Sequence, residues 1–195
     1  MRPVVLPEKH SATPVLDSVE IGFAQDMTAH HQQALQMVQR LDPNAAPTVR
    51  RLAQQLADSQ RTEIGTMLGW LRLAKATPLS PRPMAWMHAE TGASHHHSSA
   101  TQHDGSAASG TGMPGMATTA ELDALAAARG RDAEIQFLRL MLRHHRGGIT
   151  MAQVADQLLT HGPVKESARS MLQAQSQEVG IIGLLLTQLG GEPLS

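Results

Sequence analysis

The chain has 195 residues, a formal net charge of −1 and no cysteine. This charge gives no electrostatic basis for binding nucleic acid or an anionic membrane surface. No apolar run approaches the ~18–20 residues of a membrane-spanning helix, and the lack of cysteine excludes disulfides and thiolate metal sites. Aromatic residues make up only 2% of the chain, whereas histidine and methionine occur eleven times each. A core built from Leu, Ala, Ile, Val and Met favours packed helices over a β-sandwich.

The first helical hairpin is predicted over residues 17–75. Asp17, followed by a glutamate three residues later, resembles a capping box and begins a helix that runs to about Arg40. Pro47 is a good first-turn residue, so we expect the second helix to begin there and to run to about Lys75.

The second hairpin is predicted over residues 118–191. A short helix follows a threonine cap and is broken at Gly130, after which a long helix runs to about Leu159. The last helix begins at Pro163 and ends before two glycines. Two hairpins that cannot bury their apolar faces alone are expected to dock, so the sequence predicts an all-α four-helix bundle made of two similar hairpins.

One motif occurs in both hairpins. The segments FAQDMTAHHQQALQM (23–37) and FLRLMLRHHRGGITM (137–151) share the pattern F-x3-M-x2-HH-x5-M. At ~100° per residue, the Phe, Met and His side chains of each copy lie on one face of their helix, which predicts that both histidine pairs are buried. Gln25 falls outside that face. Ala34 and Gly148 occupy matching positions, where a bulky side chain would block the space between the histidines and a facing helix. The candidate metal ligands are these inward histidines and methionines: His30, His31, His144, His145, Met27, Met37, Met141 and Met151.

The partner helices carry a second repeat, Q-x-x-E followed by a β-branched residue. In the helical projection Glu63 and Glu178 lie on apolar stripes. A buried carboxylate without a partner is unstable, so each glutamate needs a hydrogen-bond donor or a raised pKa. We expect both glutamates to accept hydrogen bonds from the imidazoles and so orient them. Gln60 and Gln175 are expected to support the histidines in the same way, without binding the metal directly.

Residues 76–117 are rich in Pro, Gly, Ser, Ala and Thr, and are predicted to form a flexible linker. Two interpretations of its histidines and methionines stay open. One is a low-complexity spacer with a chance cluster, and the other is a loop that captures metal and becomes ordered with it. The residues of this candidate linker site are Met84, Met87, His88, His95, His96, His97, His103, Met113 and Met116.

Imidazole together with thioether is a soft to borderline donor set that suits copper, as Cu(I) or Cu(II). Zinc is the alternative metal, although it gains little from a thioether. A di-iron bundle uses Glu-x-x-His, but Met27 and Met141 stand where those glutamates would be. No nucleophilic triad, phosphate loop or nucleotide signature is present, so a catalytic role is not favoured.

These motifs resemble the domain-of-unknown-function 305 family. The resemblance covers roughly residues 18–75 and 118–190, and its segments are FAQDMTAHHQQALQM, QRTEIGTMLGWL, LAAARGRDAEIQFLRLMLRHHRGGITMAQ and QAQSQEVGIIGLLL. It implies a ferritin-like four-helix bundle, often exported, with some members associated with copper binding and tolerance through His and Met. The chain departs from the family pattern at Gly148, where alanine is usual, and in its long His-rich insertion.

The sequence thus predicts a metal-binding protein that buffers copper or confers copper tolerance, in the periplasm or secreted. Two alternatives stay open: a structural or interaction bundle whose His–Glu pairs stabilise the core, and a ferritin-like metalloenzyme. Residues 1–16 are predicted to be a disordered N-terminal segment and lack the apolar region of a signal peptide, so a cytoplasmic location also stays open. The expected partner is a metal ion; homodimerisation stays open.

Overall fold

The protein is all-helical in the part that a computed structural model describes, residues 15–88 and 112–194. This confirms the predicted fold class. Four long helices account for most of it, and none of the described helices is long and apolar enough to cross a membrane. The helices are α1 (Ser18–Arg40), α2 (Pro47–Leu73), α3 (Thr119–Ala127), α4 (Gly130–Leu158) and α5 (Pro163–Gln188), with one 3-10 turn, η1 (Ala85–His88).

Local capping signals set where the helices begin. The Asp17 carboxylate accepts hydrogen bonds from the Val19 and Glu20 amides, and the Glu20 carboxylate accepts one from the Asp17 amide, which completes the predicted capping box of α1. Thr118 begins α3 with a second capping box. Both α2 and α5 begin at a proline, whose missing amide hydrogen costs nothing in a first turn.

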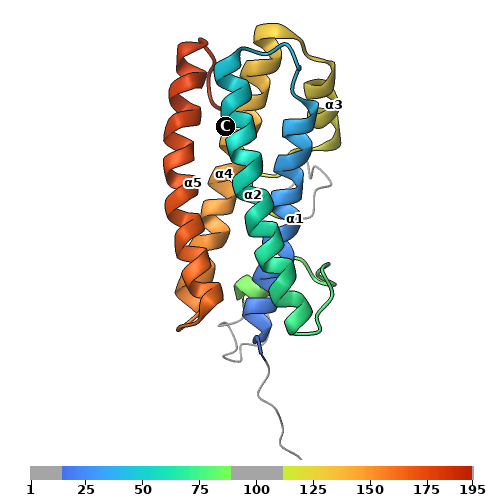
Figure 1. Ribbon diagram of the computed structural model, residues 1–195, viewed down its shortest axis with the longest axis vertical. Coiled ribbons are helices and arrows are strands. Elements are labelled where there is room, and N and C mark those ends of the chain that lie inside the picture. The colour runs from blue at the N-terminus through green and yellow to red at the C-terminus, as the bar shows by residue number, and fades with distance from the viewer. Residues whose placement is uncertain (1–14, 89–111, 195) are drawn as a thin grey trace, which may run out of the picture.

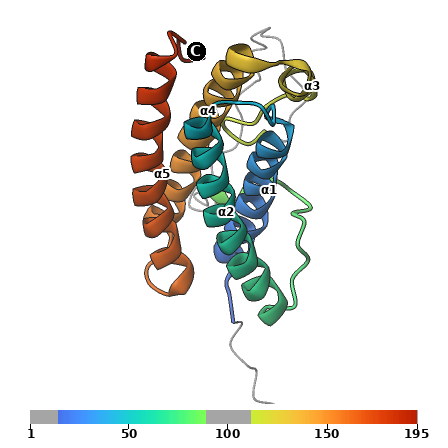
Figure 2. The ribbon, with the colours of Figure 1, turned by 45° about the horizontal axis from the view of Figure 1, so that its top comes forward.

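Each hairpin is packed within itself, α1 against α2 and α4 against α5, and the two hairpins meet mainly through α1 and α4 (Figure 1). In Figure 1, α1 runs upwards and α4 downwards, so these two helices are antiparallel. Figure 2 shows α3 beside the end of α1 and the start of α4. The motif of α1 and the motif of α4 therefore face each other in the middle of the bundle.

The segments on either side of residues 89–111 pack against the bundle, although the sequence predicts a flexible linker over all of 76–117. Trp86 is only 5% exposed, donates a hydrogen bond from Nε1 to Asp26 Oδ2 at 2.9 Å, and packs edge-on against Phe23 with ring centroids 5.5 Å apart. Gln25, which the helical projection places away from the core, is buried by the same segment and donates to the Thr77 carbonyl. Residues 89–111 lie outside the described residues.

The N-terminal segment predicted over residues 1–16 lies outside the described residues except for its last two. Of these two, Leu16 is buried in the core and Val15 is exposed.

Candidate metal centre

The four motif histidines form a layer in the middle of the bundle. All four are at most 1% exposed, as the helical projection predicts. The rings of His30 and His144 stack across the α1–α4 interface, with centroids 3.7 Å apart and planes 29° from parallel. His31 and His145 flank this stack, at 6.3 Å and 6.2 Å from the neighbouring ring of their own helix. The fold thus brings both copies of the motif to one place.

Three of these histidines use only Nε2 for hydrogen bonding. His30 Nε2 lies 3.1 Å from the Pro114 carbonyl, and His144 Nε2 lies 2.9 Å from the His30 carbonyl. A carbonyl can only accept, so both Nε2 atoms carry the proton. His31 Nε2 lies 2.6 Å from Glu63 Oε2, where an ionised carboxylate accepts as well. In the neutral ring, Nδ1 of each of these three histidines is therefore an unprotonated lone pair.

These three lone pairs have no hydrogen-bond partner among the described residues. The Nδ1 atoms of His30, His31 and His144 are all buried and unpaired. An unpaired buried acceptor costs roughly 1–3 kcal/mol, and most native structures avoid it. Each of these three buried atoms is therefore a candidate donor to a metal ion.

His145 differs from the other three because both of its nitrogens are paired. Nδ1 donates to the Met141 carbonyl at 3.0 Å, one turn earlier on α4. Nε2 lies 2.8 Å from Glu178 Oε2. His145 has no lone pair free for a ligand in this arrangement.

Burial keeps the stacked histidines neutral. Desolvation, with the neighbouring His31 adding to it, lowers the pKa of His30 to about 3. Desolvation, followed by the nearby His30 and His145, lowers the pKa of His144 well below its usual value. Both rings therefore stay unprotonated at Nδ1 near neutral pH, the form that binds metal ions.

The four motif methionines are completely buried and lie on either side of the histidine layer. Met27 and Met151 belong to one cluster of buried side chains, and Met37 and Met141 to the other. Each cluster thus takes one motif methionine from each hairpin. Any site that combines this sulfur with the histidines would be shared between the two copies of the motif.

The glutamates and glutamines of the second repeat lie beside the histidines. Glu63 and Glu178, whose side chains are 21% and 20% exposed, each contact one histidine of their own hairpin. Gln60 and Gln175 are buried, and Gln60 Oε1 and Gln175 Nε2 have no partner among the described residues. The Gln175 amide fills the space left by Gly148, because a Cβ at that glycine would lie 2.3 Å from Gln175 Oε1.

The linker residues that the structure describes divide into buried and exposed ones. Met113 is buried and Met84, Met87 and Met116 are partly buried, and all four pack on the cluster that contains Met27. His88 is exposed at the end of η1. The other candidates of the linker site lie outside the described residues: His95, His96, His97 and His103.

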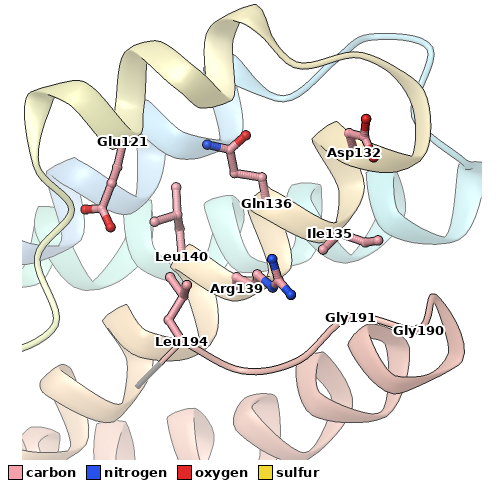
Figure 3. A pocket seen from close by; sticks show the side chains of 9 residues that line it. All are labelled: Glu121, Asp132, Ile135, Gln136, Arg139, Leu140, Gly190, Gly191 and Leu194. Carbon is pink, nitrogen blue, oxygen red and sulfur yellow. The ribbon is translucent and has the colours of Figure 1, made fainter.

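No three His, Cys, Asp or Glu side chains are grouped so as to hold one metal ion, within residues 15–88 and 112–194. A site with three protein donors therefore needs a donor of another kind, such as methionine sulfur, or a movement of these side chains. A surface hollow of about 490 Å³ lies between α4 and the C-terminal residues (Figure 3), and none of the candidate ligands lines it.

Sequence reasoning missed two groups at this centre. The Pro114 carbonyl, which accepts from His30, and Gln33, which holds the same segment through Ala117, come from no motif. A main-chain acceptor leaves no signal in residue types, and Gln33 differs in no visible way from the exposed Gln32 beside it. Their roles depend on a contact between residues 84 positions apart.

A family model described as "Domain of unknown function (DUF305)" matches residues 20–185, most of the chain. The chain belongs to the DUF305 family. The family predicted from the motifs is thus confirmed.

Two solved DUF305 structures resemble the chain. One, from Streptomyces coelicolor and named as a candidate secreted protein, is 35% identical with a TM-score of 0.76, and the match covers 91% of this chain and 96% of that one. The other, a DUF305 fragment from Deinococcus radiodurans, is 28% identical with a TM-score of 0.68, over 88% of this chain and 97% of that one. The search of curated proteins gave no match.

The DUF305 chain also shares its fold with CopM, which has been solved in two copper-bound forms. The Cu(II)-bound form is 23% identical with a TM-score of 0.60, over 87% of this chain and 96% of that one. The Cu(I)-bound form is 21% identical with a TM-score of 0.61, over 88% and 98%. At these identities the comparison establishes the fold.

Proposed function

We propose that this DUF305 protein binds copper as its cargo, and that it buffers or carries the ion in the periplasm or outside the cell. The observation that carries the proposal is the set of three buried Nδ1 lone pairs, on His30, His31 and His144, that lack hydrogen-bond partners. Burial of an unpaired acceptor is unfavourable, and a bound ion would remove that cost. The core retains these polar groups where Leu or Ala would pack without any such cost.

The surrounding side chains favour copper over zinc. The buried sulfurs of Met27, Met37, Met141 and Met151 flank the histidine layer, and thioether with imidazole is a soft to borderline donor set. Zinc prefers imidazole with thiolate or carboxylate oxygen, but the nearby carboxylates of Glu63 and Glu178 already accept from imidazole Nε2 atoms. In this proposal they orient the rings and remain outside the set of ligands.

The comparisons support the metal and the location. CopM, which shares the fold, was solved with Cu(I) and with Cu(II). The Streptomyces coelicolor relative is named as a candidate secreted protein. A chain without cysteine suits an oxidising compartment, where a thiol is easily oxidised.

A structural role for the histidines is the second candidate, and one observation favours it. The His31–Glu63 contact joins α1 to α2, and the His145–Glu178 contact joins α4 to α5, so each holds one hairpin together. If these contacts only stabilise the bundle, metal ions will leave the melting temperature unchanged. Histidine variants will then lose stability and no metal affinity.

Titration of the metal-free protein with Cu(I), Cu(II) and Zn(II) tests the proposal. We expect copper to bind and to raise the melting temperature, and the His30→Ala/His144→Ala variant to lose most of that affinity. His161→Ala, which removes an exposed histidine, is the matched control and should bind like the wild type. Affinity that is unchanged in the double variant would contradict the buried site, and absence of copper binding by the wild type would contradict the function. Metal analysis of protein purified without a nickel column gives a second, independent reading.

A further inference from the structure

Residues 112–117 form a strap that crosses α4 and leads into α3 (yellow in Figure 2). Two glycines allow its backbone to lie directly on that helix. A Cβ on Gly147 of α4 would lie 2.0 Å from the Pro114 carbonyl oxygen, and a Cβ on Gly115 would lie 2.4 Å from the Arg143 carbonyl oxygen. Gly115 also has a positive φ of +79°, which other residues rarely adopt.

Gln33 of α1 holds the other end of the strap through two hydrogen bonds. Its side-chain amide donates to the Ala117 carbonyl at 2.9 Å and accepts from the Ala117 amide at 2.6 Å. Gln33 and Gly147 occupy matching positions in the two copies of the motif, each three residues after the first histidine. One copy thus supplies a long side chain that holds the strap, and the other supplies the space in which the strap lies.

The strap provides the hydrogen-bond acceptor of His30. The Pro114 carbonyl, which lies against Gly147, is the group that accepts from His30 Nε2. His144, the ring stacked on His30, depends on no such strap, because its Nε2 donates to a main-chain carbonyl of α1. Without the Pro114 carbonyl, nothing described would keep the His30 proton on Nε2, and Nδ1 could carry it instead.

We propose that Gln33 and Gly147 are positioning residues, which hold the Pro114 carbonyl against His30 and so keep His30 Nδ1 free of a proton. The purpose of this arrangement rests on the proposed function, since Nδ1 is the atom assigned to copper. The protonation of the ring itself is a property of the metal-free protein. It can be measured whether or not copper binds.

Nitrogen-15 spectra of ring-labelled, metal-free protein test the inference. We expect wild-type His30 to carry its proton on Nε2 alone. Gln33→Met, which keeps the volume and removes both bonds to Ala117, and Gly147→Ala, which pushes the strap away, should both give a mixture with the Nδ1-protonated form. His144 should keep its proton on Nε2 alone in both variants. Gln32→Met, at an exposed neighbour, and Gly65→Ala, at a helical glycine with open space, are the matched controls.

Detection of a proton on His30 Nδ1 in the wild type would overturn the inference. This measurement uses the wild type alone, so it is conclusive even if a variant does not fold. Retention of the Nε2 form alone in both folded variants overturns it as well.

A Cu(I) titration of the same proteins is the second readout. Loss of a group that orients a ligand typically lowers metal affinity about 10–100-fold, and we expect that loss in both strap variants and in neither control. If the wild type binds no copper, the proposed function fails while the result on the ring proton stands.

Discussion

His31 and His145 occupy matching positions in the two copies of the motif, yet the structure gives them different chemistry. Both are completely buried, and both direct Nε2 at a glutamate of their own hairpin, at 2.6 Å and 2.8 Å. They differ at Nδ1, which is unpaired in His31 and donates to the Met141 carbonyl in His145. A sequence repeat therefore fixes which residue types face the core, but the hydrogen bonds of each ring decide which atoms can bind a metal.

The largest expected effect is a difference in copper affinity between variants of these two histidines. His31→Ala removes a proposed ligand, so it should weaken Cu(I) binding by more than the ~10–100-fold that is typical for the loss of a group that only orients a ligand. His145→Ala removes a ring whose nitrogens are both paired, so its loss of affinity should not exceed that range. Competition titrations with a colorimetric Cu(I) chelator measure both values. Equal losses in the two variants would remove the distinction between the copies.

The stacked pair, His30 and His144, predicts a pH dependence of stability in the metal-free protein. The unfolded chain takes up a proton on each ring below the ordinary pKa of 6.5, while burial keeps His30 neutral in the fold down to about pH 3. The stability due to this neutral core is therefore fully present above pH 6.5 and is lost as the pH falls, by up to about 1.4 kcal/mol per pH unit for each ring.

Urea unfolding of the wild type and of a His30→Gln variant between pH 7.5 and pH 4.5 measures this dependence. Glutamine does not titrate, so the variant should lose stability less steeply by about 1.4 kcal/mol per pH unit. Parallel slopes for the two proteins would show that His30 is not held neutral by burial.

The smallest expected effect concerns Gly148, the position that matches Ala34. A Cβ there would approach Gln175 Oε1, the end of a flexible side chain that can move aside. Alanine also favours a helix over glycine by about 1 kcal/mol, so Gly148→Ala should change the free energy of unfolding by less than about 1 kcal/mol in either direction. Thermal unfolding measures the change, with Gly65→Ala as the control for helix propensity alone. A much larger destabilisation would mean that the Gln175 side chain cannot move aside.

The starts of the helices and the inward direction of the histidine pairs could be predicted from the sequence, because both depend on local signals. The capping box at Asp17 and the prolines at positions 47 and 163 mark helix starts, and the 3.6-residue period directs the histidine pairs inwards. The same projection wrongly left Gln25 at the surface, because it could not include the segment around Trp86 that covers it.

The candidate site was predictable only at the level of residue types. The motif names the histidines and methionines, and a helical projection places them in the core. Which nitrogen of His145 meets the Met141 carbonyl, and which carbonyl meets His30, depend on side-chain rotation and on the path of the strap. The spacing of residues along the motif encodes neither the rotation of the side chains nor the path of the strap. The division of the four methionines between two clusters follows from the antiparallel meeting of α1 and α4, which required the structure.

The most direct test of copper binding is the nitrogen-15 spectrum of ring-labelled protein before and after addition of Cu(I), a diamagnetic ion. If copper binds at the three buried lone pairs, the Nδ1 resonances of His30, His31 and His144 will shift on binding, while Nδ1 of His145 and both nitrogens of His161 will stay in place. Unchanged resonances of those three histidines at saturating Cu(I), or shifts confined to other histidines, would contradict binding at these lone pairs.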